Sequence, residues 1–485
     1  MRALAVEEDS SLKEKASLGI GGIFSLVMLY LLFVLVAVKG ATDLDKIVTP
    51  LQLVLTLLLF VSLAITNQEK RILVFFLFLP LAGFAIPPRS LRISLLFVAS
   101  TVMMIIVLRK DHSLGFSELL KSSVGPLMKW YAAWFGVWSL ISYFGVDMLS
   151  SLYSIFLFFF LPLIAVVLFQ AREQGIGPDE LWIGIKAALW ICVIFVGFQL
   201  IFGLDYSLSQ FQNQNFFQEN TGIRYPGPFT DSIAFSQFLS VLLLFVLMFR
   251  PRRFDIIGIF VGVLGFIVLL LNGSRTAPIG AVLGMLFVSF MTPGNRTKIV
   301  IRVVVILAIV LFVSLFIDLE KIALVKRLLL IQFAAEKRIS IWLKSITIFF
   351  AYPWTGIGFD NFSKVVLKFN PEGFWKTSEG AVPYISPESG YLKFLTETGI
   401  VGFFVFSAFI VRTIIEYVKA LRNRTLDHQS SSFIAASFAS YICILISQIT
   451  VYTLIDPRIL FLLGFLTAIP FLYGRHKVTE AVLKQ

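Results

Sequence analysis

The chain has 485 residues, of which 58% are hydrophobic and 14% are charged, and its formal net charge is +12. Soluble globular domains carry nearer about a quarter charged residues, so a single large soluble core is excluded. The excess of basic residues is explained by basic loops between membrane spans, so the charge does not call for a nucleic-acid partner.

Apolar runs close to the ~20 residues needed to cross a bilayer recur along the chain. They predict about fourteen membrane-spanning helices, because lipid leaves the backbone no hydrogen-bond partner but itself. The predicted spans are 17–40, 47–66, 71–88, 92–108, 124–144, 147–170, 180–203, 232–249, 255–271, 275–291, 303–317, 388–412, 431–454 and 458–473. The pairs divided by Pro87-Pro88 and by Gly145 leave the count between about 12 and 14. The expected fold class is all-α, a polytopic integral membrane helix bundle.

Lysine and arginine concentrate in alternate loops, and the positive-inside rule then places both termini in the cytoplasm. The chain is thus expected to be a multi-pass protein of the plasma or inner membrane. The longer loops 204–231 and 318–387 would both face outward. Four regions follow: N-terminal transmembrane helices (1–203), core transmembrane helices with arginine-bearing outer loops (204–317), a large extracytoplasmic loop (318–387) and C-terminal transmembrane helices (388–485).

Cysteine and histidine offer little chemistry at the outer face. Cys192 and Cys443 both fall inside predicted spans, so no disulfide framework is indicated. The histidines His112, His428 and His476 fall in predicted cytoplasmic loops. No histidine metal site, histidine base or phosphate-cradling glycine loop is therefore expected on the outer side, and no metal or cofactor is predicted.

Four helices are predicted to begin at the outer surface, each marked by capping residues. The caps are Thr230 or Asp231, Asn272 or Ser274, Ser386 followed by Pro387 and Glu388, and Asp456 followed by Pro457. A helix N-terminus carries partial positive charge and unpaired amide donors, so these starts favour anions.

Three arginines stand at or just before these helix starts, where the helix dipole opposes a cation. They are Arg224, Arg275 and Arg458. An anion that joins them would explain the arrangement, and a lipid pyrophosphate suits the bidentate fork of arginine. The alternative is that each arginine pairs with a nearby acid or reaches lipid headgroups. We favour this alternative for Arg458 and the functional interpretation for Arg275 and Arg224.

The polar segment 318–387 divides into two parts. Residues 318–350 have apolar positions at helical spacing among basic residues, which predicts an amphipathic helix at the interface. Arg338 and Trp342 are four residues apart and so share a face. The remainder is rich in glycine, proline and aromatic residues and is expected to be irregular chain. It is suited to stacking on sugar rings, or else it merely covers the bundle.

Two acidic residues follow this segment. An acid at Glu388, in a predicted first helical turn, is what capping alone would favour. It could equally be a general base near an anion site, and the two interpretations remain open. Glu397 lies deeper and is harder to explain as capping, so we expect it to hold Tyr391 or a neighbouring helix.

Four stretches together resemble the O-antigen ligase / O-antigen polymerase superfamily of bacterial membrane glycosyltransferases. They are IRYPGPFTDSIAFSQFL, LLNGSRTAPIGAVLGML, RISIWLKSITIFFAYPWTGIGFDNF and ESGYLKFLTETGIVG, in order over residues 223–402. The resemblance implies a glycan on undecaprenyl pyrophosphate as donor, with Arg224 and Arg275 holding the pyrophosphate and Arg338 in the outer loop. It implies transfer to an acceptor hydroxyl without metal or nucleotide, among membrane lipid, with a chain-length regulator protein as a candidate partner.

One departure from the family pattern concerns the start of the span after the large loop. The ligases have His-Asn there, whereas this chain has Glu388-Ser389. This favours a polymerase of an exopolysaccharide, teichuronic acid or similar surface polymer over transfer to lipopolysaccharide core. The expected catalytic residues are Glu388, Arg275 and Arg224, and the expected substrate-binding residues are Arg338, Arg458, Trp342 and Tyr391.

Two alternatives to the polymerase stay open. The first is the ligase proper, which joins finished polymer to another acceptor. The second is a lipid-linked oligosaccharide flippase, which also has many spans. A flippase is expected to have two similar halves around a central cationic cavity, and no similarity between halves is visible in this sequence.

Overall fold

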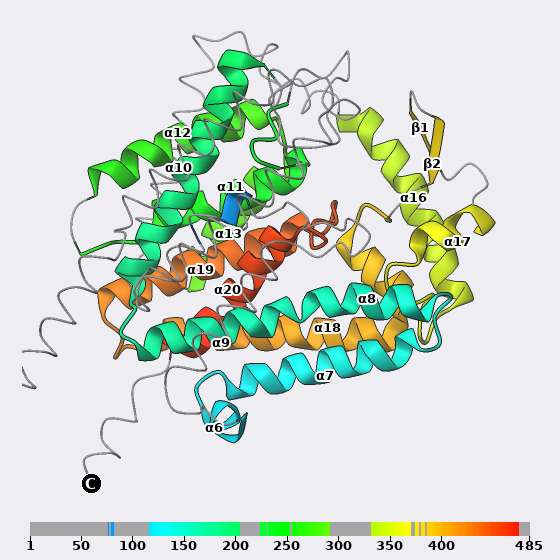
Figure 1. Ribbon diagram of the computed structural model, residues 1–485, viewed down its shortest axis with the longest axis horizontal. Helices are drawn as coiled ribbons and strands as arrows, with labels where there is room; N and C mark the ends of the chain where they lie inside the picture. The colour runs from blue at the N-terminus through cyan, green and yellow to red at the C-terminus, as the bar shows by residue number, and fades with distance from the viewer. Residues whose placement is uncertain are drawn as a thin grey trace, which may run out of the picture.

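The fold is given by a computed structural model that describes residues 76, 79–81, 116–203, 224–229, 231–252, 255–291, 331–369, 374–377, 380–383 and 386–474. Its helices are η2 (Leu79–Leu81), α6 (Phe116–Lys121), α7 (Gly125–Ser142), α8 (Met148–Phe158), α9 (Phe160–Glu173), α10 (Pro178–Phe202), α11 (Ser232–Met248), α12 (Ile256–Asn272), α13 (Thr276–Met291), α16 (Ile331–Ala351), α17 (Phe362–Phe369), α18 (Gly390–Arg422), α19 (His428–Ser447) and α20 (Pro457–Tyr473). Two short strands, β1 (Phe374–Thr377) and β2 (Gly380–Pro383), pair antiparallel. The arrangement is shown in Figure 1.

The helices have the length and composition of membrane spans. Among the residues that the structure describes, four apolar stretches are long enough to cross a bilayer: Met148–Glu173, Pro178–Phe202, Gly390–Arg422 and His428–Ser447. Shorter apolar helices are Ser232–Met248, Ile256–Asn272, Thr276–Met291 and Pro457–Tyr473. The all-helical membrane fold class is thereby confirmed. The predicted spans 17–40, 47–66, 92–108 and 303–317, and nearly all of 71–88, lie outside the described residues.

The centre of the bundle is formed by α19 and α20. Every residue from Arg458 to Tyr473 in α20 is buried, and α19 packs against α11, α13 and α20 (Figure 1). By contrast, α12 exposes Ile256, Phe260 and Val263, which recur at helical spacing on one face. An exposed apolar stripe on a helix of this kind is the expected lipid-facing side of a membrane bundle.

Helix α18 is interrupted near its start. Gly399 has φ 62° and ψ −172°, a backbone conformation open essentially to glycine alone. The chain segment 352–361, which follows α16, fills the break. The amide of Ile400 donates to the carbonyl of Pro353 at 2.8 Å, and the amide of Ile357 donates to the carbonyl of Thr396 at 3.2 Å. Backbone groups freed by the break are thus bonded within the protein.

The polar segment is more regular than its composition predicts. The described part of the expected interfacial helix is α16, and it packs against α18 (Figure 1). The remainder was expected to be irregular, and this expectation was wrong in part, because it contains α17 and the β1–β2 pair. Both elements are only 4 to 8 residues long, too short for a hydrophobic period to be read from the sequence.

Candidate functional site

One end of the bundle gathers several helix termini. The side-chain amide of Asn272, at the end of α12, donates to the carbonyl of Tyr225 at 3.0 Å. The amide of Gly390, at the start of α18, donates to the carbonyl of Gln448 at 2.8 Å. The hydroxyls of Thr276 and Thr450 are 3.2 Å apart. The starts of α13 and α18 therefore lie beside the end of α19, near the segment that precedes α11.

Glu388 does not lie in the first turn of α18. The helix begins at Gly390, and its cap is Ser389, whose hydroxyl accepts from the amide of Leu392. The predicted cap at Ser386 was therefore wrong, and capping does not explain the glutamate. Glu388 has φ 55°, a left-handed conformation that is uncommon for a residue with a side chain. Such outliers persist where surrounding structure enforces them, and they cluster at functional sites.

The carboxylate of Glu388 forms an ion pair with Arg338 of α16. The guanidinium Nε lies 3.2 Å from Oε2, and the two side chains are 26% and 33% exposed. Burial raises the pKa of Glu388, the charge and hydrogen bond of Arg338 oppose this rise, and the charge of Asp231 adds to it. Two residues singled out from the sequence are thus in direct contact, although 50 positions separate them.

Arg275 immediately precedes α13, and its carbonyl accepts from the amide of Ile279. Partial burial lowers the pKa of Arg275, and the charge of Arg338 lowers it further. The two guanidinium groups are therefore close enough to repel each other. Like charges held together at a helix start favour binding of an anion, since an anion relieves the repulsion.

Arg224 lies on the same side, just ahead of α11. Its Nη1 donates to the hydroxyl of Ser232 at 3.0 Å. Its Nε is buried and has no hydrogen-bond partner among the described residues. The carboxylate of Asp231 caps α11 by accepting from the amides of Ile233 and Ala234, which confirms one of the two predicted caps. A buried donor without a partner costs free energy, so this guanidinium retains capacity for a further acceptor.

Arg458 is fully engaged within the protein. Its guanidinium forms two hydrogen bonds with Asp456, the cap of α20, and donates to the carbonyls of Pro80 and Pro228. It also lies over the ring of Phe229 at 3.4 Å. These contacts match the structural alternative considered for this arginine. Its role in substrate binding stays a prediction.

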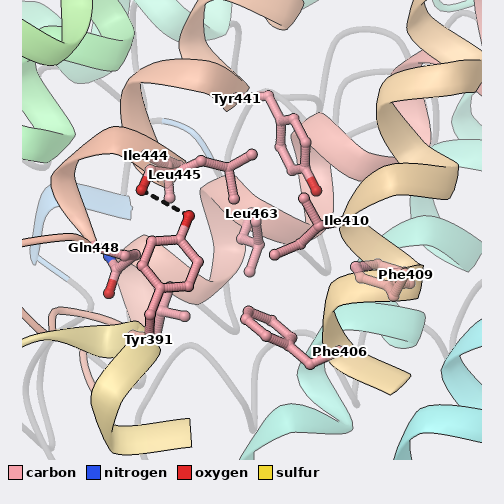
Figure 2. A pocket seen from close by; sticks show the side chains of 10 residues that line it. Tyr391, Phe406, Phe409, Ile410, Tyr441, Ile444, Leu445, Gln448 and Leu463 are labelled. Atoms are coloured by element: carbon pink, nitrogen blue, oxygen red, sulfur yellow. Dashed lines mark hydrogen bonds between the residues drawn. The ribbon is translucent and has the colours of Figure 1, made fainter. Parts of the chain in front are cut away.

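Trp342 and Tyr391 are placed differently from each other. Trp342 is half-buried on α16, one helical turn beyond Arg338, and its indole N–H has no partner among the described residues. The hydroxyl of Tyr391 instead donates to the carbonyl of Leu445 at 2.9 Å, inside the bundle. Figure 2 shows this bond beside a cavity of about 10 Å³ between α18, α19 and α20. The cavity has room for about one water molecule, the bond to Leu445 joins α18 to α19, and a role of Tyr391 in substrate binding stays a prediction.

One cluster of charged residues was predicted only in part from the sequence. Lys393, Glu397 and Asp360 form a buried ion cluster between α18 and the segment 352–361. Glu397 had been expected to hold Tyr391 or a neighbouring helix, but it binds Lys393 and this segment instead. The signal was available, because a lysine and a glutamate four residues apart inside an apolar span form a pair on one helix face.

Comparison with known proteins bears on this end of the bundle. Residues 260–407 match the family model described as O-Antigen ligase. This match over 148 of the 485 residues supports membership of the O-antigen ligase/polymerase superfamily. The matched segment includes Arg275, Arg338 and Glu388, whereas Arg224 and Arg458 lie outside it. No curated protein matches the chain.

The domain match supports a function of the ligase/polymerase type in a membrane protein. It favours a glycosyl transferase over the flippase that the sequence left open. It does not separate a polymerase from a ligase, and it names no sugar.

Proposed function

We propose that the protein is a polymerase of a cell-surface polysaccharide. It would transfer a glycan from undecaprenyl pyrophosphate to a hydroxyl of a lipid-linked repeat unit at the outer face of the cell membrane, with both termini in the cytoplasm. The observation that carries the proposal is the ion pair of Arg338 with Glu388 at the end of the bundle where α13 begins with Arg275 just before it. Two cations and a carboxylate are what transfer from a pyrophosphate to a hydroxyl requires.

The transfer step uses these groups as follows. Glu388 takes the proton of the acceptor hydroxyl, and the oxygen forms a bond to the anomeric carbon of the donor sugar. The bond from that carbon to the pyrophosphate oxygen breaks, and undecaprenyl pyrophosphate leaves. Arg275 and Arg224 bind the pyrophosphate oxygens, whose negative charge grows as the bond breaks. The raised pKa of Glu388 suits a base, because a stronger base accepts the proton more readily.

Arg338 has two roles in this scheme. In the absence of substrate it pairs with Glu388, and with donor bound it would add its charge to that of Arg275 in stabilising the pyrophosphate. Trp342 lies one helical turn along α16, and its indole N–H, which has no partner in the described part of the chain, would donate to a sugar oxygen. Aromatic residues are well suited to sugar rings because they combine an apolar face with a polar edge.

The ligase remains the second candidate, since the matching family model carries that description. Purified protein with a defined undecaprenyl-pyrophosphate-linked repeat as the sole substrate separates the two. A polymerase makes a ladder of longer lipid-linked chains from this substrate alone. A ligase makes product only when a different acceptor is added.

The same reaction tests the assigned base. Glu388→Gln is expected to lower turnover by about 10²–10⁴-fold, the usual contribution of a positioned base. Asp427→Asn is the control, because Asp427 caps α19 at the other end of the bundle and asparagine caps equally well. Unchanged turnover in Glu388→Gln would remove this residue from the mechanism. Absence of any transfer by wild type, with or without a second acceptor, would refute the transferase.

A further inference from the structure

The ion cluster between α18 and the segment 352–361 is almost closed to solvent. The ammonium of Lys393 is 2.7 Å from Glu397 and 3.2 Å from Asp360, and the three side chains are 1%, 0% and 19% exposed. The ammonium also lies over the rings of Phe359 and Tyr452. Removing charges from water is costly, and a well-packed apolar core is often as stable. A buried cluster of this kind therefore calls for a reason beyond stability.

Glu397 bonds the segment through both of its carboxylate oxygens. Oε2 accepts from the amide of Asp360 at 2.8 Å, and Oε1 accepts from the amide of Phe362 at 3.2 Å. The carbonyl of Glu397 accepts from the amide of Gly358 at 3.0 Å. Asp360 has φ 61° and accepts from the hydroxyl of Ser154 in α8 as well. The segment is therefore tied to α18 by main-chain and charged side-chain bonds together.

The two elements that this cluster joins are continuous in the chain with the residues that carry the ion pair: the segment 352–361 follows α16, and α18 follows Glu388. Arg338 lies on α16, which continues at Ala351 into the segment 352–361. Glu388 lies five residues before Lys393, at the start of α18. The first part of α18 and the segment 352–361 thus connect Glu388 to Arg338 through the bonds of the ion cluster. A shift of the segment along α18 would move Arg338 relative to Glu388.

We propose that Lys393, Glu397 and Asp360 are positioning residues that lock the segment 352–361 onto α18 and so hold Arg338 against Glu388. The catalytic consequence rests on the function proposed above, whereas the lock itself does not. None of the three residues is placed in contact with substrate. They act through the alignment of the base and its arginine.

Cross-linking tests the lock without any need for activity. Arg338→Cys and Glu388→Cys are combined in a protein whose native cysteines are replaced (Cys192→Ala, Cys443→Ala), and a short bismaleimide joins the new thiols. Lys393→Met is expected to slow cross-linking by about tenfold, because the two thiols lose their fixed mutual placement. Lys393→Arg keeps a cation between the carboxylates and is expected to keep the rate.

Glu416→Gln is the matched control. Glu416 is a buried glutamate of the same helix, and it pairs with Arg412 at the same four-residue spacing but near the far end of α18. It should leave the cross-linking rate unchanged. Asp360→Asn keeps the shape of the side chain and tolerates the left-handed backbone, so it serves if Lys393→Met does not fold. Equal cross-linking rates in the double-cysteine parent and in its Lys393→Met and Asp360→Asn variants would overturn the lock.

Kinetics on the chain with native Arg338 and Glu388 test the consequence. Lys393→Met should lower kcat by about 100-fold, with KM for the lipid-linked donor held within about twofold, because alignment rather than binding is lost. Lys393→Arg should restore kcat, and Glu416→Gln should not affect it. Slow cross-linking with normal kcat would overturn the positioning role. Fast cross-linking in the double-cysteine protein, together with no transfer activity in wild type, would support the lock and refute the proposed function.

Discussion

Glu388 adopts a backbone conformation that costs a residue with a side chain about 1–2 kcal/mol. Glycine would relieve this strain, so the side chain must contribute something else at this position. The contact that the Glu388 side chain makes in the structure is the ion pair with Arg338. A partly exposed ion pair adds little to stability, about 0–1 kcal/mol, which leaves chemistry as the better explanation for the glutamate.

The charges around Glu388 predict how activity depends on pH. Burial raises the pKa of Glu388 above the ordinary range of a glutamate, Arg338 opposes the rise, and Asp231 adds to it. A base must be deprotonated to act, so transfer is lost as pH falls through this raised pKa. Arg338→Met should therefore move the acidic limb of kcat to higher pH, and Asp231→Asn should move it to lower pH.

The paired variants provide their own control. Asn retains the cap of α11, so Asp231→Asn changes charge while preserving the helix start. The pH profile of kcat for the two proteins is the measurement. Shifts in the same direction, or no shift in either, would show that Glu388 does not set the acidic limb.

At this scale the sequence allowed candidate site residues to be named but not their contacts, and their roles stay predictions. Arg275, Arg338 and Glu388 could be singled out because a charge beside an apolar span is rare. The contact between Arg338 and Glu388 could not be predicted, since it depends on how α16 packs against α18. The cap was misplaced because Ser386 and Ser389 both suit a helix start, and tertiary contacts decide between them.

Among the helices and strands, the site depends most on the break in α18. The sequence predicts a continuous span over 388–412, whereas Gly399 interrupts it. Nothing local requires the break. It exists because the segment 352–361 supplies hydrogen-bond partners for the freed groups, which the bilayer could not do.

The break makes Gly399 intolerant of a side chain. A Cβ on Gly399 would lie 2.3 Å from the carbonyl oxygen of Trp354, and its φ of 62° with extended ψ is open essentially to glycine alone. Gly399→Ala should destabilise the protein by about 3 kcal/mol or more. Gly197→Ala in α10 is the control, because a Cβ there meets nothing within 4 Å. It should be neutral or stabilise by about 0.5–1 kcal/mol.

Thermal unfolding of the purified variants measures both effects. Gly399→Ala is also expected to abolish transfer, because it displaces the segment 352–361 and with it Arg338. A Gly399→Ala protein with the melting temperature of wild type would show that α18 can run straight through this position.

At the scale of the whole molecule, basic residues occupy the end opposite to the proposed site. Arg250 and Arg252 contact His428 and Gln429 at the start of α19, and α18 ends with Lys419 and Arg422. The sequence predicts that these basic loops face the cytoplasm, because the positive-inside rule needs only loop composition, and the orientation stays a prediction. It could not predict which outer loops meet, since that depends on helix packing.

Helix α18 runs between the end of the bundle with the proposed site and the opposite, basic end. From Ile400 to Arg422 a helix rises about 34 Å at ~1.5 Å per residue, which exceeds the ~30 Å hydrocarbon thickness of a bilayer. The exposed residues Lys368, on α17 beside the start of α18, and Thr425, just after its end, must then lie on opposite sides of the membrane.

Cysteine labelling in cells tests which side is which. In a chain with Cys192→Ala and Cys443→Ala, a membrane-impermeant maleimide added outside should label Lys368→Cys and spare Thr425→Cys. Both should react once the membrane is opened, which controls for reactivity of each thiol. Undecaprenyl-pyrophosphate glycans are extended at the outer face in the proposed reaction, so the site must be reached from outside. Labelling of Thr425→Cys alone would place Glu388 and its arginines in the cytoplasm and contradict that reaction.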